Sequence, residues 1–380
     1  MTDGSHERFD VRPVIVPERL DTPESAEFEA YAEVTAVVEE SVWGHRRFAY
    51  DAAQLLPMFQ DARYTGRQAF AAWEGTQCVG RAEVLWERSE DARTAEITLG
   101  VVPEVRGRGL GTELLRRAEQ HAREVGREVL TGYSDIALES LELPGPRLEA
   151  PDGGGSIPVA ALGASFATHH GYRLAQLERA SGLTTTGRLD EFRAMLTERL
   201  DRREADAAAY RLTGWTDHAP DELLDSLAAA HASMATDVPA GGLTVDLEVW
   251  NAERVRAGEQ RALAGGRTTL VQAAVAPDGS VAGYTELSLP SNSAAAFQWD
   301  TIVLGAHRGH GLGMLLKLGN LVRFTEIAPE RTDIYTWNAD ENEHMLAINI
   351  ALGFTLRGMS AEWQRDEGAG SADSGATSGS

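Results

Sequence analysis

The chain has 380 residues, of which 43% are hydrophobic and 24% charged, and its formal net charge at pH 7 is −23. This length and apolar content suffice for a sizeable core in two or three domains, whereas the negative charge disfavours broad binding to nucleic-acid phosphates. No apolar run is long enough to span a membrane, the N-terminus does not read as a secretory signal, and a single Cys78 permits neither an internal disulfide nor a cysteine-based metal site. We therefore expect a cytoplasmic protein without a membrane segment or a metal centre.

The predicted elements follow the same order in two halves of the chain. The first half is predicted to contain a strand at 11–17, a helix near 24–40, a strand at 94–102, a helix after residue 109 and a strand at 172–179. The second half is predicted to contain a strand at 210–215, a helix at 220–234, a hairpin turning at 277–279, a strand at 297–304, a helix after residue 311 and strands at 332–337 and 354–358.

A glycine-rich motif carries this internal repeat. Arg106–Gly111 (RGRGLG) recurs as Arg308–Gly313 (RGHGLG), with a Gly-x-x-Glu motif upstream and Gly-Tyr or Gly-Phe downstream of each copy. The first copy holds about twenty extra residues within the Pro/Gly-rich stretch 141–158, which reads as a loop insertion. Two copies of one domain are the simplest interpretation, with boundaries at 1–185 and 210–366, a connecting helix or linker at 186–209 and a disordered tail at 367–380.

Each glycine motif is expected to form an anion-binding turn. A strand that runs through glycines into a helix leaves backbone N–H groups unpaired at the positive end of the helix dipole, and a diphosphate is a natural ligand there. Arg106, Arg108 and Arg308 could add charge-assisted contacts. No Gly-Lys-Ser/Thr follows, so the motif is not a P-loop, and it does not match the dinucleotide fingerprint. A tight turn without a ligand is the alternative, and its occurrence twice in one context makes that alternative less attractive.

The motif also resembles that of a known family. Val102–Gly111 is similar to the acyl-CoA pyrophosphate loop of the GNAT N-acetyltransferase superfamily, and Arg308–Gly313 satisfies the same pattern. The segments Trp337–Asn342 and Met345–Phe354 resemble the later part of that family, which ends in Gly-Phe or Gly-Tyr. From residue 11 to 365 the chain is similar to tandem GNAT proteins of actinobacterial type, a group that includes mycothiol synthase.

The resemblance implies an α/β (α+β) fold with two tandem GNAT domains, each a mixed, splayed sheet flanked by helices. Acetyl-CoA, or another acyl-CoA, would be the co-substrate and would lie in the split between strands four and five, with its pantetheine pairing like an added strand. An amine would attack the thioester directly, without a covalent enzyme intermediate. The residues implied in CoA binding are Val101, Val102, Arg106, Gly107, Arg108, Gly109, Leu110 and Gly111 in the first copy and Ile302, Val303, Leu304, Arg308, Gly309, His310, Gly311, Leu312, Gly313 and Asn342 in the second.

Strand carboxylates are the candidates for the base. Ten residues before the motif arginine stand Glu96 and Gln298, and two residues further on the same strand face stand Thr98 and Asp300. Glu96 matches the position where some GNAT enzymes keep a general base, and Asp300 is the acidic group of the second copy. Glu286, on the preceding strand, is a further candidate. Burial in a cleft would raise the pKa of such a carboxylate, although each could also be an ordinary solvated strand residue.

The acid position departs from the family pattern. Many GNAT enzymes place a tyrosine four residues before the Gly-Phe/Tyr pair, and here Asn349 and Ala167 stand there. Asparagine can hold a water or the thioester but is no ordinary acid, and alanine can do neither. His231 is one of several histidines that could be bases, with a surface or capping role as the simpler interpretation.

These observations predict an acyltransferase that moves acetyl from acetyl-CoA to a small-molecule amine. The second half, with Asp300, Glu286 and Asn349, is expected to carry the chemistry, and the first half, despite Glu96, to be degenerate and to bind acyl-CoA without turnover. The acceptor could be cationic, given the acidic chain, or an amine in a peptide or natural product. No nucleic-acid or membrane partner is expected, and the oligomeric state stays open. The alternative is a non-catalytic acyl-CoA-binding or scaffolding protein, motivated by the missing tyrosine.

Overall fold

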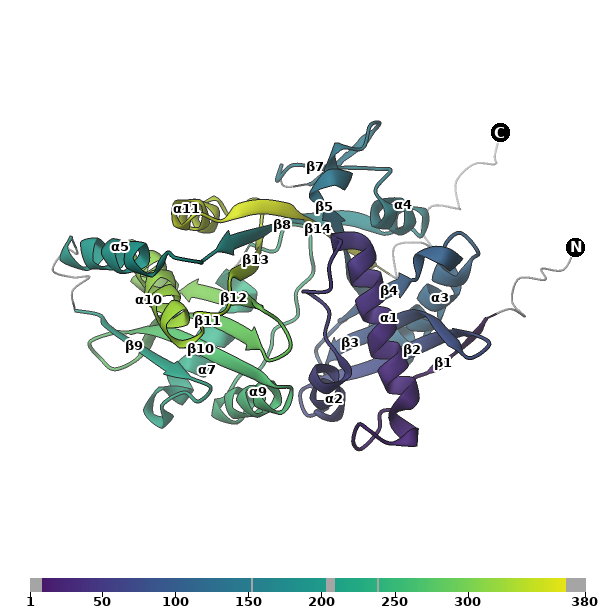
Figure 1. Ribbon diagram of the computed structural model, residues 1–380, viewed down its shortest axis with the longest axis horizontal. Helices are drawn as coiled ribbons and strands as arrows, with labels where there is room; N and C mark the ends of the chain where they lie inside the picture. Colours follow the sequence, from purple (N-terminus) through teal and green to yellow (C-terminus); the bar gives the residue numbers. More distant parts are fainter. Residues whose placement is uncertain (1–8, 152, 203–208, 238, 367–380) are drawn as a thin grey trace, which may run out of the picture.

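The fold is that of two similar α/β halves joined through one sheet (Figure 1). The structure is a computed structural model that describes residues 9–151, 153–202, 209–237 and 239–366. The predicted tail at 367–380 lies outside the described residues. The first half runs to the end of strand β8, and the second half begins at strand β9.

The first half has the predicted order of elements. Its strands and helices are β1 (Asp10–Pro13), α1 (Ala26–Trp43), α2 (Ala52–Gln60), β2 (Thr65–Glu74), β3 (Gln77–Glu87), β4 (Thr94–Val101), α3 (Leu110–Glu124), β5 (Val129–Ala137), β6 (Arg147–Glu149), β7 (Ser156–Pro158), α4 (Leu162–His169) and β8 (Arg173–Thr184). The predicted opening strand is too long, because β1 ends at Pro13 and, of the residues that follow, Val14 is buried while Ile15 and Val16 are exposed outside the sheet. The predicted loop insertion is not entirely irregular, since β6 and β7 pair as a small hairpin within it.

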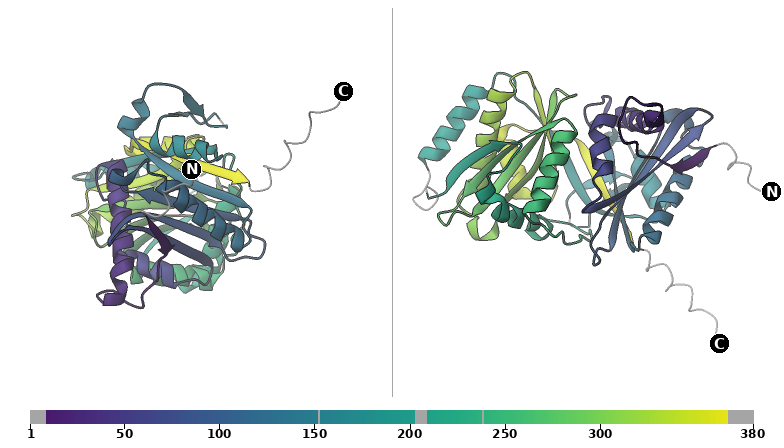
Figure 2. Two further views of the ribbon diagram at one scale, coloured as in Figure 1. Left: turned by 90° about the vertical axis from the view of Figure 1, so that its right-hand side faces the viewer. Right: turned by 90° about the horizontal axis from the view of Figure 1, so that it is seen from below.

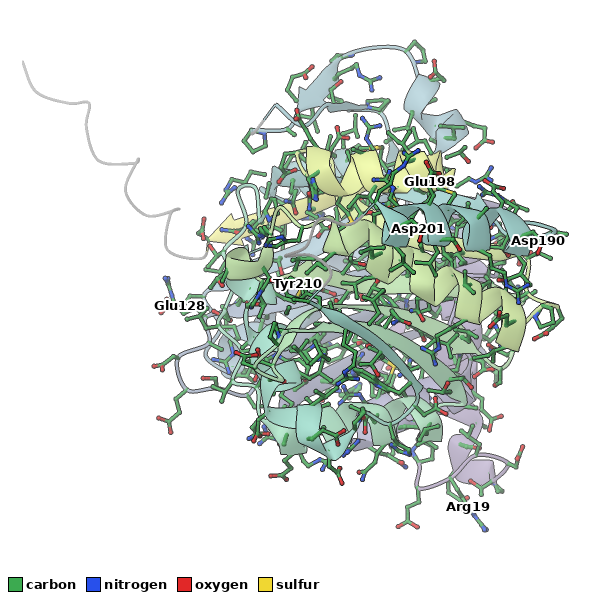
Figure 3. All side chains as sticks on the ribbon, turned by 90° about the vertical axis from the view of Figure 1, so that its left-hand side faces the viewer. Arg19, Glu128, Asp190, Glu198, Asp201 and Tyr210 are labelled. Atoms are coloured by element: carbon green, nitrogen blue, oxygen red, sulfur yellow. The ribbon has the colours of Figure 1, made fainter. Side chains whose placement is uncertain are left out.

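The second half repeats this order after the connecting helix α5 (Leu189–Asp201). Its elements are β9 (Arg211–Thr216), α7 (Leu224–Ala232), α8 (Met234–Asp237), α9 (Ala252–Ala264), β10 (Arg267–Val275), β11 (Val281–Pro290), β12 (Ala295–Val303), α10 (Leu312–Ile327), β13 (Asp333–Ala339), α11 (Glu343–Leu352) and β14 (Thr355–Asp366). Helix α5 packs on α10 through the buried Phe192, while Asp190, Glu198 and Asp201 point outward from its other side (Figure 3).

The two halves exchange their last strands. The twelve-stranded sheet runs in the order β1-β2-β3-β4-β5-β14-β8-β13-β12-β11-β10-β9. Strand β14, from the end of the second half, pairs with β5 from Gly358 opposite Ala137 to Asp366 opposite Val129. Strand β8, from the first half, pairs in turn with β13. The predicted boundaries 1–185 and 210–366 therefore divide the chain but not the sheet. Strand β14 of the second half pairs with β5 of the first, and β8 of the first half pairs with β13 of the second (Figures 1 and 2).

Each half contains one pair of parallel strands that diverge. Strands β4 and β5 pair only from Thr94 opposite Val129 to Glu96 opposite Thr131, and β12 and β13 pair over three residues in the same way. Beyond these pairs each sheet opens, which confirms the predicted mixed and splayed architecture. The long apolar helix that follows each glycine motif packs its buried face on the sheet; in α3 that face consists of Leu110, Leu114, Ala118 and Ala122, spaced four residues apart.

Polar contacts also tie the halves together. The buried Arg254 of α9 forms a two-pronged pair with Glu87 of β3, at 2.8 and 3.1 Å. The Asp246 carboxylate, in the coil before α9, accepts hydrogen bonds from the backbone N–H groups of Arg93 and Thr94 and from the Thr94 hydroxyl. The second half thus reaches across the start of β4 in the first.

Candidate active site

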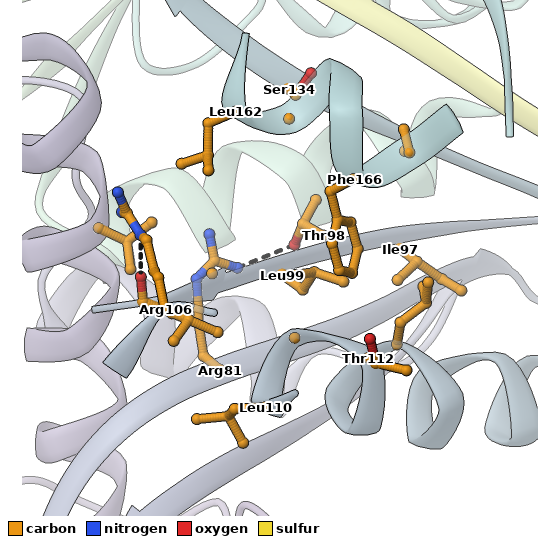
Figure 4. A pocket seen from close by; sticks show the side chains of 18 of the residues that line it. Arg81, Ile97, Thr98, Leu99, Arg106, Leu110, Thr112, Ser134, Leu162 and Phe166 are labelled. Atoms are coloured by element: carbon orange, nitrogen blue, oxygen red, sulfur yellow. Dashed lines mark hydrogen bonds between the residues drawn. The ribbon is translucent and has the colours of Figure 1, made fainter. Parts of the chain in front are cut away.

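A cavity of 420 Å³ opens where β4 and β5 diverge in the first half (Figure 4). Strand β4, the glycine loop, α3 and α4 supply most of its wall. The predicted residues Val101, Arg106, Gly107, Gly109, Leu110 and Gly111 all line it. Ala167, at the expected acid position, lines it as well, together with Leu115 and Ser134. The cavity therefore lies where the pantetheine arm was predicted.

The glycine turns are shaped to accept an anion. Gly107 and Gly109 have φ of +75° and +82°, and a Cβ added at either would meet no atom within 4 Å. Gly309 and Gly311 repeat this with φ of +86° and +68°. Gly109 and Gly311 are the N-cap residues of α3 and α10, and neither helix has a side-chain cap. The first-turn N–H groups are thus left for an outside acceptor, which fits the diphosphate of CoA in both halves.

The motif arginines link each turn to the end of the preceding strand and to a neighbouring helix. Arg106 donates from Nε to the Val101 carbonyl oxygen at 2.9 Å and from Nη2 to Ser41 at the end of α1. Arg308 does the same with the Val303 carbonyl oxygen, at 3.0 Å, and with Asp237 of α8. Both guanidinium groups thus bond to the strand end and to a neighbouring helix, and their contact with phosphate stays a prediction.

The other predicted CoA residues take several roles. Val102 is buried, and Arg108 bonds back to the Glu104 carbonyl oxygen. Asn342 Oδ1 accepts a hydrogen bond from the Met345 N–H and so caps α11. The side-chain oxygen that was expected to face CoA is therefore used within the protein. The ring of His310 lies 5.5 Å from that of Tyr210. The remaining predicted residues of the second copy form the strand end, the turn and the start of α10, namely Ile302, Val303, Leu304, Gly309, Leu312 and Gly313.

Glu96 lines a hollow that both halves form. This hollow has a volume of 310 Å³, and its wall also contains Thr131, Glu362 of the exchanged strand and residues 243–246 of the second half. Solvent reaches the Glu96 side chain, but the surrounding protein partly desolvates it, which together with the charge of Glu83 raises its pKa. The next two residues of β4, Ile97 and Thr98, line the 420 Å³ cavity. Tyr133, two residues beyond Thr131 on β5, lines the larger cavity, and burial raises its pKa well above the usual value. The first half therefore presents an acidic group beside the cavity.

Three side chains of the second half form a hydrogen-bonded chain. The buried Tyr284 of β11 donates to Asp300 Oδ2 of β12 at 2.8 Å, and its oxygen lies 2.7 Å from His231 Nδ1 of α7. His231 stacks on Trp250 with 4.3 Å between ring centroids. Burial and the nearby Asp300 charge raise the pKa of Glu286 to about 7. The structure thus brings the predicted Asp300 and Glu286 together with His231, which the sequence offered as one of several possible bases, and with Tyr284, which the sequence analysis did not single out.

A bulge changes which residues of the two copies correspond. In the first half Leu85 pairs with Glu96, whereas the matching Ser288 pairs with Phe297. A register shift between Thr285 and Leu287 accounts for the extra residue. The expectation that Gln298 shares the place and strand face of Glu96 is therefore wrong. Gln298 is buried and donates to Thr285 and to the Glu286 carbonyl oxygen.

Asn349 belongs to a separate buried cluster. Its Oδ1 accepts from Lys317 Nζ at 2.9 Å, and its Nδ2 donates to Asn338 Oδ1 at 2.6 Å. Lys317 is 1% exposed, and burial lowers its pKa to about 7. The sequence shows Lys317 as the only lysine of the chain, yet its place on the buried face of α10 was a signal that the sequence analysis did not use.

Part of the chain matches a known protein family. The acetyltransferase (GNAT) family matches residues 31–136, a range that includes β4, the glycine turn and α3. The first half contains a GNAT acetyltransferase domain. No curated protein sequence matches the chain.

Solved structures extend the GNAT fold to both halves. A tandem GNAT protein from the clavulanic acid biosynthesis pathway superposes with a TM-score of 0.68 and 24% identity, over 95% of this chain and 99% of that protein. A GCN5-related N-acetyltransferase from Sphaerobacter thermophilus gives 0.56 and 16%, over 95% and 96%. The chain has the tandem GNAT fold and, with its GNAT domain, is an enzyme of the acyl-transfer class. Within the described residues no helix is long and apolar enough to cross a bilayer, and no group of acidic, histidine or cysteine side chains could hold a metal ion.

Proposed function

We propose that the protein transfers an acetyl group from acetyl-CoA, or another acyl group from its CoA thioester, to the amine of a small molecule by direct attack. The second half carries the transfer, and the first half binds acyl-CoA in its 420 Å³ cavity. The observation that carries the assignment is the hydrogen-bonded chain of His231, Tyr284 and Asp300. In the first half, Arg81 stands at the position equivalent to Tyr284 and Thr98 at that equivalent to Asp300. Arg81 and Thr98 both line the first-half cavity.

The direction of the hydrogen bonds gives the chain a proton acceptor. Because the Tyr284 hydroxyl donates to Asp300, its oxygen can only accept from His231, so the proton of the neutral imidazole sits on Nδ1. Nε2 then carries the lone pair. An ammonium that reaches this site can lose its proton to His231 or to Glu286, and its free amine then attacks the thioester carbonyl. Burial keeps the pKa of Tyr284 well above 10, so that the hydroxyl stays a donor throughout.

The same site supports a cationic acceptor. Asp300 and Glu286 lie together, and His231 Nδ1, 3.6 Å from Asp300 Oδ2, is positive only when the imidazole is protonated. Glu259 adds a further carboxylate to the field at Glu286, which Arg267 partly offsets. A protonated amine would relieve this repulsion and lower the pKa of Glu286 on binding. A small polar natural product with a primary amine fits these requirements.

Matched variants of the two glycine turns test the assignment. Gly109 and Gly311 are the N-caps of equivalent helices with positive φ, a conformation and position that Asp tolerates, and an Asp there places a negative charge where the diphosphate is expected. We expect Gly311→Asp to abolish amine-dependent release of CoA thiol. We expect Gly109→Asp to remove one acyl-CoA site in calorimetric titration while thiol release persists. The reverse pattern would assign the chemistry to the first half.

One observation favours that second candidate, transfer in the first half. Glu96 lines the 310 Å³ hollow, and the next two residues of β4 line the 420 Å³ cavity, which is a suitable place for a base between thioester and amine. Against it, Ala167 leaves the acid position empty of any polar group. Comparison of Glu96→Gln with Asp300→Asn in the same thiol-release assay decides between the halves. Tight acyl-CoA binding with no thiol release from a broad panel of amines would instead support the non-catalytic alternative.

A further inference from the structure

Lys317, Asn349 and Asn338 of the second half correspond to three residues that line the first-half cavity. The helices α3 and α10 begin at Leu110 and Leu312, so Lys317 takes the place of Leu115. Asn349 takes the place of Ala167, since the N–H groups of Phe354 and Tyr172 bond to their carbonyl oxygens in the same way.

Asn338 takes the place of Ser134 by the pairing of β12 with β13 and of β4 with β5. Ser134, Leu115 and Ala167 all line the first-half cavity. The three polar residues therefore stand where the first half lines its cavity with small or apolar groups.

This cluster contains a proton donor. Only one of the three ammonium protons of Lys317 is needed for the bond to Asn349 Oδ1. The neighbours of the ammonium group are neutral: the Asn349 amide and the ring of Phe354, whose centroid lies 5.8 Å from Nζ. Burial is the sole cause of the lowered pKa of about 7, which makes this ammonium a stronger acid than an ordinary lysine.

We propose that Lys317 donates the proton to the departing CoA thiolate in the second half, in the role expected of a tyrosine at position 349. This inference rests on the proposed function of that half. The amine nitrogen forms a bond to the thioester carbonyl carbon, the carbon–sulfur bond breaks with its electron pair on sulfur, and a proton passes from Nζ to sulfur. The proton lost by the amine goes to the His231–Tyr284–Asp300 chain or Glu286. Solvent reprotonates Lys317 after CoA leaves.

Asn349 has a positioning part in this arrangement. It holds Nζ through Oδ1 and is itself fixed by Asn338, so the ammonium has one defined direction along the wall. A buried positive charge beside the sulfur also stabilises the thiolate as it forms, because the surroundings are poorly solvated.

Because the chain has one lysine, its proton state can be read directly. Full-length protein labelled with ¹⁵N-lysine gives a single Nζ signal from the folded chain. We expect that signal to titrate near pH 7 in the free protein and to move upward by about one pH unit or more when CoA thiol is added, because a thiolate stabilises the ammonium. The proposal would be overturned if CoA did not change the pH at which this signal titrates, in either the wild-type protein or Gly109→Asp.

Rate measurements separate an acid from a structural lysine. Lys317→Gln keeps a donor for Asn349 but has no proton to give, and Lys317→Met removes both. We expect both variants to lower kcat for thiol release on the order of 10²-fold, with the KM for acyl-CoA changed little, and to lose the decline in rate above pH 7.

Rescue by Gln would assign Lys317 a structural role. Loss of rate in Asp300→Asn together with normal rates in both Lys317 variants refutes the acid role alone, whereas normal rates in all three refute second-half chemistry itself. Denaturant midpoints of each variant identify any loss that is due to misfolding.

Discussion

Removal of one hydroxyl tests the assignment of chemistry to the second half. The Tyr284 side chain is fully buried, and its hydroxyl makes two hydrogen bonds, one of them to a carboxylate. A hydrogen bond to a charged group contributes about 1.5–3 kcal/mol and a neutral one about 0.5–1.5 kcal/mol. The Asp300 side chain is 38% exposed, so water can replace part of the first bond. We therefore expect Tyr284→Phe to lower the free energy of unfolding by about 2 kcal/mol.

Tyr31→Phe is the matched control in the first half. Tyr31 is also buried, and its hydroxyl donates to Glu83 at 2.8 Å. Arg67 still pairs with Glu83 after the change, so we expect a loss of about 1–2 kcal/mol. Denaturant unfolding should thus show comparable destabilisation, while only Tyr284→Phe should lose thiol release, by about 10²-fold. Full turnover in folded Tyr284→Phe would refute the role of the hydrogen-bonded chain.

Three further predictions concern pH, the interface and the exchanged strand. The pKa of Glu286 is raised to about 7 in the folded protein, so the stability associated with its bound proton is greatest below the unfolded pKa and is lost as the pH rises to about 7. Denaturant midpoints measured at pH 5 and pH 8 should therefore differ less in Glu286→Gln than in the wild type. Arg254→Ala leaves the Glu87 carboxylate buried without its partner, so we expect it to lower the free energy of unfolding by about 3–5 kcal/mol. Arg93→Ala should lower it by less than about 1 kcal/mol, because both side chains of the Arg93–Glu128 pair are exposed. A chain that ends at Gly353 lacks β14 and exposes the edges of β5 and β8; size-exclusion chromatography should show aggregation, and addition of the missing segment as a peptide should reduce it.

The repeat made much of each half predictable from the sequence. The glycine turns, the helices after them and the closing strands lie close to their predicted positions, because glycine at positive φ and apolar residues spaced four apart are local signals. The partner of β14 is not a local signal. Residues 355–366 could have paired within their own half, and the choice of β5 depends on the packing of both lobes.

The candidate site shows the same limit at the level of single residues. Asp300 and Glu286 were found because acidic residues on neighbouring strands can be counted from the glycine motif. His231 was named only as one of several possible bases, because it lies on α7, far from Tyr284 in the chain, and only the packing of that helix on β11 brings its ring to Tyr284. Counting also failed at Gln298, where one bulged residue in β12 turned the side chain to the opposite face.

The repeat and its departures together explain how one fold can hold two different sites. Both halves keep the same turn, since the positive-φ glycines and the bond from the motif arginine to the strand end are alike in each. Three equivalent positions differ: Leu115, Ala167 and Ser134 line the cavity of the first half, and Lys317, Asn349 and Asn338 introduce hydrogen-bonding groups in the second. A domain that only needs to hold acyl-CoA gains from apolar space. A domain that must take a proton from the amine and give one to the thiolate needs titratable groups held in place by their neighbours. Tyr284 holds Asp300 in this way, and Asn349 holds Lys317.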